Sequence, residues 1–408
     1  MDDRQQDDGG KKIHWALEHM PVLRALQSEF LKEKPFLGKR LAISIHLEAK
    51  TACLALLLRD GGAEVYLTGS NPLSTQNEIV AALEGQERLI VNARRDLDES
   101  EYADCLRVSL EAKPDLLLED GGDMISLLLD EYPHLSRSVA GGTEETTTGV
   151  TRLRRWEREG KLSFGMYAVN DARMKHLIDN RYGTGQSVWD AILRTTNLLV
   201  AGKNVLIAGF GWCGRGLALR ATGLGARVAV SEVDPVKAVE ASMEGYEVTS
   251  LIEGIKKADF LITATGGSDI VTEEALMMAK DGLVIANASH FDTEIDRSGL
   301  ERFAQFDSVV RPNIREFRSK AGKRIYLIGE GKIVNLSAGD GHPVEIMDIS
   351  FALQALTLRY IADHGPVKPG LYSVPPEVDN QVARMKLETL GVKTDALTDS
   401  QRSYLGLD

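Results

Sequence analysis

The feature that most constrains this fold is a glycine-rich turn between an apolar run and a helical segment. The run VLIA at 205–208 leads directly into GFGWCG at 209–214, and the helical segment follows. In such a turn the first glycine bends the chain, the second admits a pyrophosphate, and the third lets helix and strand pack closely. The helix N-terminus also offers unpaired N–H groups to phosphates. We therefore predict a dinucleotide site with Gly209, Gly211 and Gly214 among its contacts.

A carboxylate at the end of the next apolar run indicates which dinucleotide binds. Glu232 closes the run RVAVSE at 227–232. A carboxylate there accepts hydrogen bonds from ribose hydroxyls and repels a 2′-phosphate, which favours NAD over NADP. Lys237 lies nearby and weakens that preference, so we count it as a further cofactor contact. The alternative, a glycine-rich turn beside a solvated glutamate, explains the strand–turn–helix context less well.

Short apolar runs alternate with helical segments along most of the chain. This alternation predicts an α/β fold with doubly wound parallel sheets. We expect helices at 12–30, 46–59 and 175–201, and mainly helices from about 339 to 390. The expected strands lie at 39–45, 63–68, 115–118, 163–169, 205–208, 227–232, 260–265 and 282–289.

Composition limits the class of protein and its environment. The 408 residues carry a net charge of −12, which argues against a nucleic-acid surface because such surfaces are basic. No apolar run approaches membrane-spanning length, so we expect no membrane partner. The three cysteines are scattered and fit neither a disulfide framework nor a zinc site. We therefore expect a cytoplasmic protein.

Polar residues follow several of the predicted strands, where open α/β sheets bind ligands. Asp120 lies in EDGGD at 119–123, and adjacent glycines would let the backbone approach a ligand closely. A tight acidic turn, or a metal site with Asp123, is the alternative; no third well-spaced ligand is evident, so we predict no metal. Lys175 and Asp179 are four apart on a predicted helix and face the same way, as an ordinary surface ion pair also would.

Longer motifs resemble the S-adenosylhomocysteine hydrolase family over nearly the whole chain. They are SNPLSTQ (70–76), EDGGD (119–123), EETTTGV (144–150), VNDARMKHLIDNRYG (169–183), GFGWCGRG (209–216), MEGYEV (243–248), ASHFDTEID (288–296) and VNLSAGDGHP (334–343). The variants HLEAKTA (46–52) and NRYGTGQS (180–187) resemble the archaeal and Thermotoga-type branch, which includes enzymes assigned to S-inosylhomocysteine.

The resemblance implies two Rossmann-like domains joined by hinges. A substrate domain would span 1–183 and be completed by 342–385, an NAD-binding domain would span 184–341, and 386–408 would form a helical C-terminal segment. It also implies a homotetramer. The family's usual tail after SYLGLD, whose lysine and tyrosine reach a neighbouring subunit's NAD site, has no counterpart in this sequence. We therefore expect weaker or more exchangeable NAD.

The resemblance also implies a reaction in which hydride leaves the substrate and returns. Bound NAD oxidises the 3′-hydroxyl, the ketone acidifies C4′–H, elimination expels homocysteine, water adds, and the ketone is reduced again. Lys175, with a lowered pKa, would be the base at the 3′-hydroxyl, while Asp179 and Glu145 would hold the ribose hydroxyls. Asp120 would remove the C4′ proton.

Histidines and hydroxyl residues in the matched motifs complete the predicted site. His46, His290 and His342 would serve C5′, the leaving sulfur and substrate binding. Further NAD contacts follow by resemblance, and asparagines suit a carboxamide because they both donate and accept. These contacts are Thr146, Thr147, Thr148, Asn180, Thr265, Asn287 and Asn335. Thr184 stands where many family members have a cysteine near the cofactor.

The purine contacts depart from the common pattern and leave the substrate open. Glu48, Lys50 and Thr51 occupy the segment that would meet the base, where common members have threonine, then glutamine or glutamate, at the positions of Glu48 and Lys50. Lysine only donates, which suits the 6-oxo group of hypoxanthine and hence S-inosylhomocysteine. Alternatively, Lys50 pairs with a carboxylate such as Glu48, and the substrate is S-adenosylhomocysteine.

Two other classes of protein remain compatible with the dinucleotide turn. One is an NAD dehydrogenase with net hydride transfer, and the other is a non-catalytic NAD-binding homologue. An NAD dehydrogenase needs neither a second base, to remove a proton from carbon, nor histidines beside a leaving group. The second would not be expected to keep Lys175, Asp179, Asp120, Glu145, His46 and His290 together.

Overall fold

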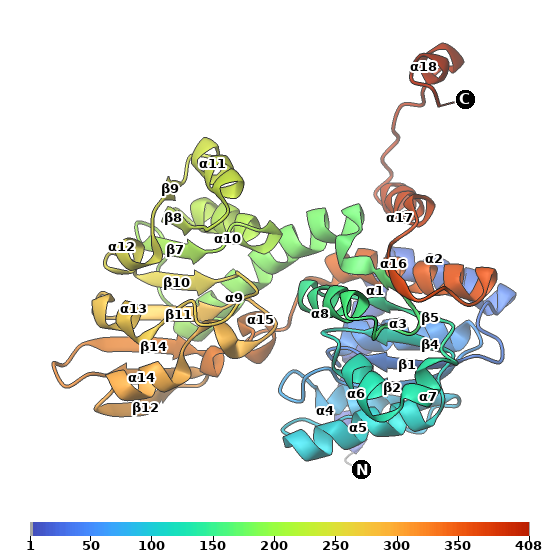
Figure 1. The fold of residues 1–408 in the computed structure, drawn as a ribbon, viewed down its shortest axis with the longest axis horizontal. Coiled ribbons are helices and arrows are strands. Elements are labelled where there is room, and N and C mark those ends of the chain that lie inside the picture. The colour runs from blue at the N-terminus through green and yellow to red at the C-terminus, as the bar shows by residue number, and fades with distance from the viewer. Residues whose placement is uncertain (1–2, 408) are drawn as a thin grey trace.

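The computed structural model describes residues 3–407 and divides them into two lobes, each built on one sheet with helices on both faces (Figure 1). One lobe holds the N-terminal half of the chain together with the returning helix α16 (Val344–His364). The other holds the strands between residues 204 and 328. The predicted α/β class is confirmed. Within the described residues, no helix is long and apolar enough to cross a membrane.

The first sheet is entirely parallel and runs in the order β3-β2-β1-β4-β5-β6-β15. Its strands are β1 (Arg40–Ser44), β2 (Glu64–Thr68), β3 (Leu89–Val91), β4 (Leu116–Glu119), β5 (Gly141–Glu144), β6 (Gly165–Ala168) and β15 (Gly370–Ser373). The strand order reverses between β1 and β4. A crevice for ligands therefore opens at the carboxyl ends of these two strands.

Eight helices accompany these strands before residue 160. They are α1 (Asp3–Glu18), α2 (Pro21–Glu33), α3 (Ala49–Asp60), α4 (Asn77–Leu83), α5 (Glu99–Glu111), α6 (Asp123–Glu131), α7 (Pro133–Ser136) and α8 (Thr147–Arg158). The single helix predicted over 12–30 is in fact α1 and α2. Pro21 causes the break, because its ring cannot continue a helix but suits the first position of a new one.

The second sheet repeats the same core order, β9-β8-β7-β10-β11-β14, and adds β13 and β12 at its edge. Its strands are β7 (Asn204–Ala208), β8 (Arg227–Ser231), β9 (Glu247–Val248), β10 (Phe260–Thr263), β11 (Leu283–Asn287), β12 (Phe306–Arg311), β13 (Ile314–Arg318) and β14 (Arg324–Ile328). The predicted doubly wound parallel sheet is present, but the two edge pairings, β12–β13 and β13–β14, are antiparallel and were not predicted. The switch point lies between β7 and β10.

Helices flank the second sheet, and further helices follow its last strand, β14. They are α9 (Thr184–Thr196), α10 (Trp212–Gly223), α11 (Pro235–Met243), α12 (Leu251–Ile255), α13 (Glu273–Met278), α14 (Arg297–Phe303), α15 (Val334–Ser337), α16, α17 (Pro376–Thr389) and α18 (Asp399–Tyr404). Figure 1 shows α18 standing away from the body beyond an exposed link from α17.

The burial of the central strands in the two hydrophobic cores explains why these strands could be predicted from the sequence. Leu206 and Ile207 of β7 are almost fully buried, as are Leu41 and Ile43 of β1. Strands of parallel sheets covered on both faces read as continuous apolar runs. Each buried aliphatic side chain contributes roughly 1.5–3 kcal/mol relative to exposure. The central strands of both sheets are therefore the easiest elements to predict.

The helix predicted over 175–201 begins in an unexpected form. Residues Lys175–Gly183 are a π-helix, η2, and the α-helix α9 continues from Thr184. A π-helix bonds each residue to the fifth along, and such segments frequently mark functional sites. Here this spacing places Asn180 beside Lys175: the Lys175 Nζ donates to Asn180 Oδ1 at 2.9 Å.

Candidate functional site

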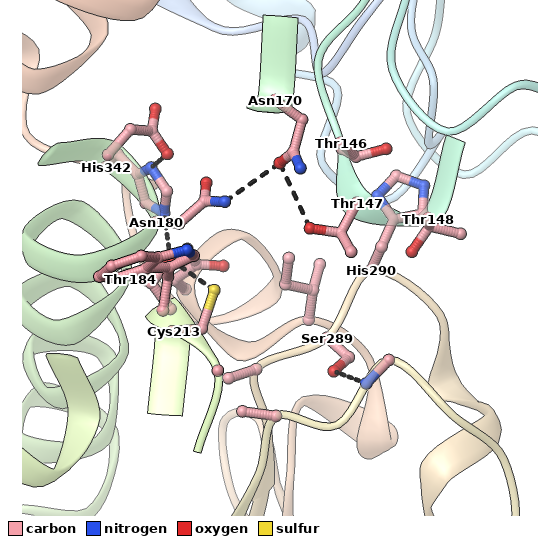
Figure 2. A pocket seen from close by; sticks show the side chains of 18 of the residues that line it. Thr146, Thr147, Thr148, Asn170, Asn180, Thr184, Cys213, Ser289, His290 and His342 are labelled. Carbon is pink, nitrogen blue, oxygen red and sulfur yellow. Dashed lines mark hydrogen bonds and ion pairs between the residues drawn. The ribbon is translucent and has the colours of Figure 1, made fainter. Parts of the chain in front are cut away.

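A cavity of about 560 Å³ lies between the two lobes and receives loops from both switch points. Loops after β1, β4 and β5 line it from one lobe, and loops after β7, β10 and β11 line it from the other. Figure 2 shows Thr146, Thr147 and Thr148 on one side of this pocket, with Cys213 and Ser289 on the opposing ribbons. Two ligand crevices thus face each other across one shared space.

Most residues predicted for the site lie on the wall of this cavity. They are His46, Glu48, Lys50, Thr51, Asp120, Glu145, Thr146, Thr147, Thr148, Lys175, Asp179, Asn180, Gly209, Gly211, Glu232, Lys237, Thr265, His290, Asn335 and His342. Gly214 and Asn287 do not line it. A Cβ on Gly214 would lie 2.0 Å from the Gly209 carbonyl oxygen, so this glycine serves helix–strand packing. The Asn287 side chain instead binds its own loop, donating to the Phe291 carbonyl at 2.8 Å and accepting from Ser289 N at 2.8 Å.

Lys175 is the centre of a buried charged cluster. Its Nζ lies 2.8 Å from Asp179 Oδ1 and 3.1 Å from Glu145 Oε1. Burial lowers the pKa of Lys175, but the carboxylates of Asp179 and Glu145 raise it by more, so the net shift is upward. The expected lowering of this pKa is therefore wrong for the protein alone, because sequence spacing did not reveal the second carboxylate beside the ammonium.

The two carboxyl groups of this cluster have opposite pKa shifts. Burial raises the pKa of Glu145 to about 7, against the opposing effect of Lys175. Burial also raises the pKa of Asp179, but Lys175 and His342 lower it by more, so Asp179 stays ionised. The His342 Nδ1 lies 3.1 Å from Asp179 Oδ1. The cluster thus contains one fixed anion and one carboxyl that titrates near neutral pH.

Helix α16 supplies two contacts to this cluster that sequence analysis missed. Ser350 Oγ donates to Asp179 Oδ2 at 2.6 Å, and Gln354 Nε2 donates to Glu145 Oε2 at 2.5 Å. Both side chains are fully buried. Polar residues inside a mainly apolar helix are the signal that could have identified them, because buried polar groups normally require a partner.

Asparagines extend the network toward the other lobe, as Figure 2 shows. Asn180 Nδ2 and Thr147 Oγ1 both donate to Asn170 Oδ1, at 3.0 Å and 3.3 Å. Thr184 Oγ1 lies 3.2 Å from His342 Nε2 and 3.6 Å from Cys213 Sγ. Asn170 and Cys213 line the cavity but were not predicted. Thr184 is therefore in contact with both His342 and Cys213.

Asp120 lies between two histidines that come from different lobes. Its Oδ2 is 3.6 Å from His46 Nε2, and its Oδ1 is 4.0 Å from His290 Nδ1. Burial lowers the pKa of His46 to about 4, so this imidazole is neutral at physiological pH. Asp120 Oδ1 is buried without a hydrogen-bond partner. The same three side chains are close enough to ligate a metal ion, a grouping that sequence spacing did not reveal.

Gly121 explains how His290 can approach Asp120. The glycine has φ +111°, and a Cβ there would lie 2.5 Å from His290 Nε2. Both the backbone conformation and the space therefore exclude a larger residue. The Gly121 backbone forms part of the surface on which the second lobe's histidine packs.

The turn after β7 has the geometry that a dinucleotide requires. Gly209 has φ +97°, and no atom lies within 4 Å of the place where a Cβ on Gly211 would stand. The carboxylate of Glu232 accepts from Phe210 N at 2.7 Å and from Val233 N at 2.7 Å. Asn335 Oδ1 is buried without a partner and remains available to a ligand amide. These features fit NAD, with Gly211 and Glu232 at its pyrophosphate and ribose.

The Lys50 ammonium group, on a residue that lines the cavity, is held by two oxygen atoms. Its Nζ lies 2.8 Å from Glu48 Oε2 and donates to the Asp340 carbonyl at 2.9 Å. Glu48 also caps α3 by accepting from Lys50 N and Thr51 N. Of the two alternatives for Lys50, the structure therefore contains the ion pair with Glu48.

Comparisons with known proteins agree with this geometry. The model of the S-adenosyl-L-homocysteine hydrolase family matches residues 1–132, and the model of that family's NAD-binding domain matches residues 180–341. A Thermotoga maritima adenosylhomocysteinase is 52% identical over 97% of this chain and 98% of its own length. A Methanosarcina mazei S-inosyl-L-homocysteine hydrolase is 48% identical over 98% of this chain and 97% of its own length.

Two facing Rossmann-like units with acid–base clusters between them define an NAD-using enzyme. The chain belongs to the S-adenosyl-L-homocysteine hydrolase family, because the family models and full-length relatives account for nearly all of it. It is accordingly a hydrolase with NAD as its cofactor.

Proposed function

We propose that the protein reversibly hydrolyses S-adenosyl-L-homocysteine to adenosine and L-homocysteine. The observation that carries this proposal is the meeting of two clusters, around Lys175 and Asp120, on one cavity with the glycine turn at 209–214. A dehydrogenase would need only one of these clusters. The named relatives support the reading, since several are adenosylhomocysteinases.

The Lys175 cluster would act at the 3′-hydroxyl of the ribose. Bound NAD would supply the hydride acceptor at C3′ and later the hydride donor, so the overall reaction is redox-neutral. Asp179 and Glu145 would hold the hydroxyls as acceptors. The Lys175 ammonium would first pass a proton to Glu145, which lies 3.1 Å away, and its free amine would then take the hydroxyl proton. Because the pKa of Glu145 is about 7, this cluster can exchange a proton near neutral pH.

The Asp120 cluster would act at C4′ and C5′. Asp120 would take the C4′ proton, the C4′–H electrons would form the C4′=C5′ bond, and the C5′–S bond would break. Neutral His46 can accept a proton from the water that adds to C5′, and His290 would give a proton to the leaving sulfur. Asp120 Oδ1 is free to act as the base because no protein donor occupies it.

The Lys50 contacts favour the adenosyl over the inosyl substrate. Two of the three ammonium donors are already used by Glu48 and the Asp340 carbonyl. One donor remains for a 6-oxo group, so S-inosyl-L-homocysteine stays the second candidate, with an inosyl-specific relative in its favour. The mechanism would be unchanged.

Thiol release from purified, NAD-supplemented protein tests these statements. The two thioethers are offered separately, and accumulation of reduced nicotinamide is followed in parallel. We expect thiol from the adenosyl compound at equal or higher efficiency and no net NADH. Thiol only from the inosyl compound would move the function to that substrate. NADH in step with product would indicate a dehydrogenase, and no thiol from either compound would indicate a non-catalytic homologue.

We also propose that the enzyme is a homotetramer in the cytoplasm. The support is the family membership and a low cysteine content. Light scattering on the purified protein measures the subunit number directly, and a mass other than four subunits would refute the tetramer.

A further inference from the structure

Two acidic pairs occupy neighbouring strand ends in the first lobe. Glu119 ends β4 and Asp120 follows it, while Glu144 ends β5 and Glu145 follows it. Glu119 lies directly opposite Glu144 in the parallel register. Asp120 and Glu145 line the cavity, whereas Glu119 and Glu144 do not and are fully buried. The proposed mechanism uses only the second member of each pair, so the first members require another explanation.

The Glu144 carboxyl group connects the two loops that carry the proposed catalytic acids. Its Oε1 accepts from Gly121 N, Thr146 N and Thr146 Oγ1, each at 2.9 Å. Gly121 follows Asp120, and Thr146 follows Glu145. One oxygen atom therefore fixes the loop after β4 against the loop after β5.

The surroundings of Glu144 are built to hold this carboxyl group in place. A Cβ on Gly149 would lie 2.0 Å from Glu144 Cδ, so helix α8 passes directly over it. Glu119 supports the same turn, accepting from Asp120 N at 3.0 Å and from Ile125 N at 3.3 Å. Burial, and then the nearby Glu119, raise the pKa of Glu144 well above its usual value. A neutral acceptor at this position is therefore compatible with the structure.

We propose that Glu144 is a positioning residue for the elimination step, holding Asp120 at a fixed place relative to Glu145. The inference rests on the proposed function, in which Glu145 holds the ribose and Asp120 takes its C4′ proton. Displacement of a catalytic group by about 1 Å can cost roughly 100-fold in rate. Hydride transfer at C3′ depends on the Lys175 cluster instead. Glu145 in that cluster is also held by Lys175 and by Gln354, so this step is less sensitive to the loss of Glu144.

Two partial reactions separate these effects in the full-length enzyme with NAD and adenosine. Formation of reduced nicotinamide reports C3′ oxidation, and exchange of the C4′ hydrogen with heavy water reports removal of the C4′ proton. In Glu144→Met, which keeps the length but removes the acceptor, we expect C4′ exchange to fall about 100-fold and hydride transfer less than about tenfold. Glu144→Gln should keep both within about tenfold, because its amide oxygen accepts the same hydrogen bonds.

The outcomes distinguish this proposal from the proposed function. Parallel loss of both partial reactions in Glu144→Met, or selective loss of exchange in Glu144→Gln, would overturn the positioning role. If Glu144→Met does not fold, Glu144→Asp withdraws the carboxyl by one methylene and should show the same selective loss. Unchanged exchange of the C4′ hydrogen in Glu144→Asp would then overturn the positioning role of Glu144. If the parent enzyme formed no NADH and exchanged no C4′ hydrogen, the proposed function would fall, and the proposal with it.

Discussion

Replacing Gly121 by alanine tests whether the two lobes meet in the working enzyme as they do in the structure. The added Cβ would lie 2.5 Å from His290 Nε2, whereas carbon atoms in ordinary contact are about 3.5 Å apart. His290 would therefore have to move by about 1 Å. A shift of that size in a catalytic group costs roughly 100-fold in rate.

Gly122→Ala is a matched control for the backbone cost. Both glycines have positive φ, +111° and +87°, so each alanine should cost about 1–3 kcal/mol in stability. A Cβ on Gly122, however, meets nothing closer than Trp156 at 3.4 Å, which is an ordinary contact. Only the Gly121 variant therefore changes the contact between lobes.

Three measurements are needed for each variant: thermal unfolding, NAD affinity and thiol release. We expect similar losses of melting temperature and unchanged NAD affinity in both variants, because neither alters the turn at 209–214. Turnover should fall about 100-fold in Gly121→Ala and by much less in Gly122→Ala. Equal turnover in the two variants would refute the contact between Gly121 and His290 during catalysis.

Three further expectations follow from individual contacts. Ser350→Ala removes a hydrogen bond to ionised Asp179 and should cost about 1–3 kcal/mol in unfolding experiments, whereas Thr357→Val should cost less because that buried hydroxyl has no partner. Glu232→Gln should weaken NAD binding and narrow discrimination against NADP in titrations, and unchanged discrimination would contradict its ribose contact. Burial raises the pKa of Glu119 from 4.5 to about 8, so the folded protein binds this proton more tightly and stability falls as pH rises through that interval. Glu119→Gln should therefore flatten the decline of melting temperature between those pH values.

The central strands and the glycine turn could be predicted because their causes are local. Residues 205–208 are apolar since both faces of β7 are covered, and the glycines at 209 and 214 are required by a turn and by close packing. The antiparallel edge of the second sheet was missed. Strand β12 is mostly exposed, so its alternation carries little of the apolar signal that marks a buried strand.

The position of the candidate site could be predicted, but its electrostatics could not. Lys175 and Asp179 share a segment, so their contact followed from spacing. The raised pKa of Lys175 depends on Asp179 and also on Glu145, which reaches it from another strand end. Ser350 and Gln354 arrive on a helix more than 150 residues later in the chain. Tertiary contacts of this kind have no signature in local sequence.

The repeated strand order explains why the glycine turn and the cluster around Asp120 lie on the same cavity. Each sheet reverses its order once, and each reversal places a crevice at the carboxyl ends of its central strands. In the first sheet the strands at the reversal carry His46 and Asp120, and in the second they carry the glycine turn and Thr265. Because the two crevices face each other, the glycine turn of one sheet and the His46 and Asp120 side chains of the other share one cavity. Neither sheet has to change its topology. Contacts that join neighbouring loops, such as those of Glu144 with Gly121 and Thr146, fix the relative positions of the groups that line this cavity.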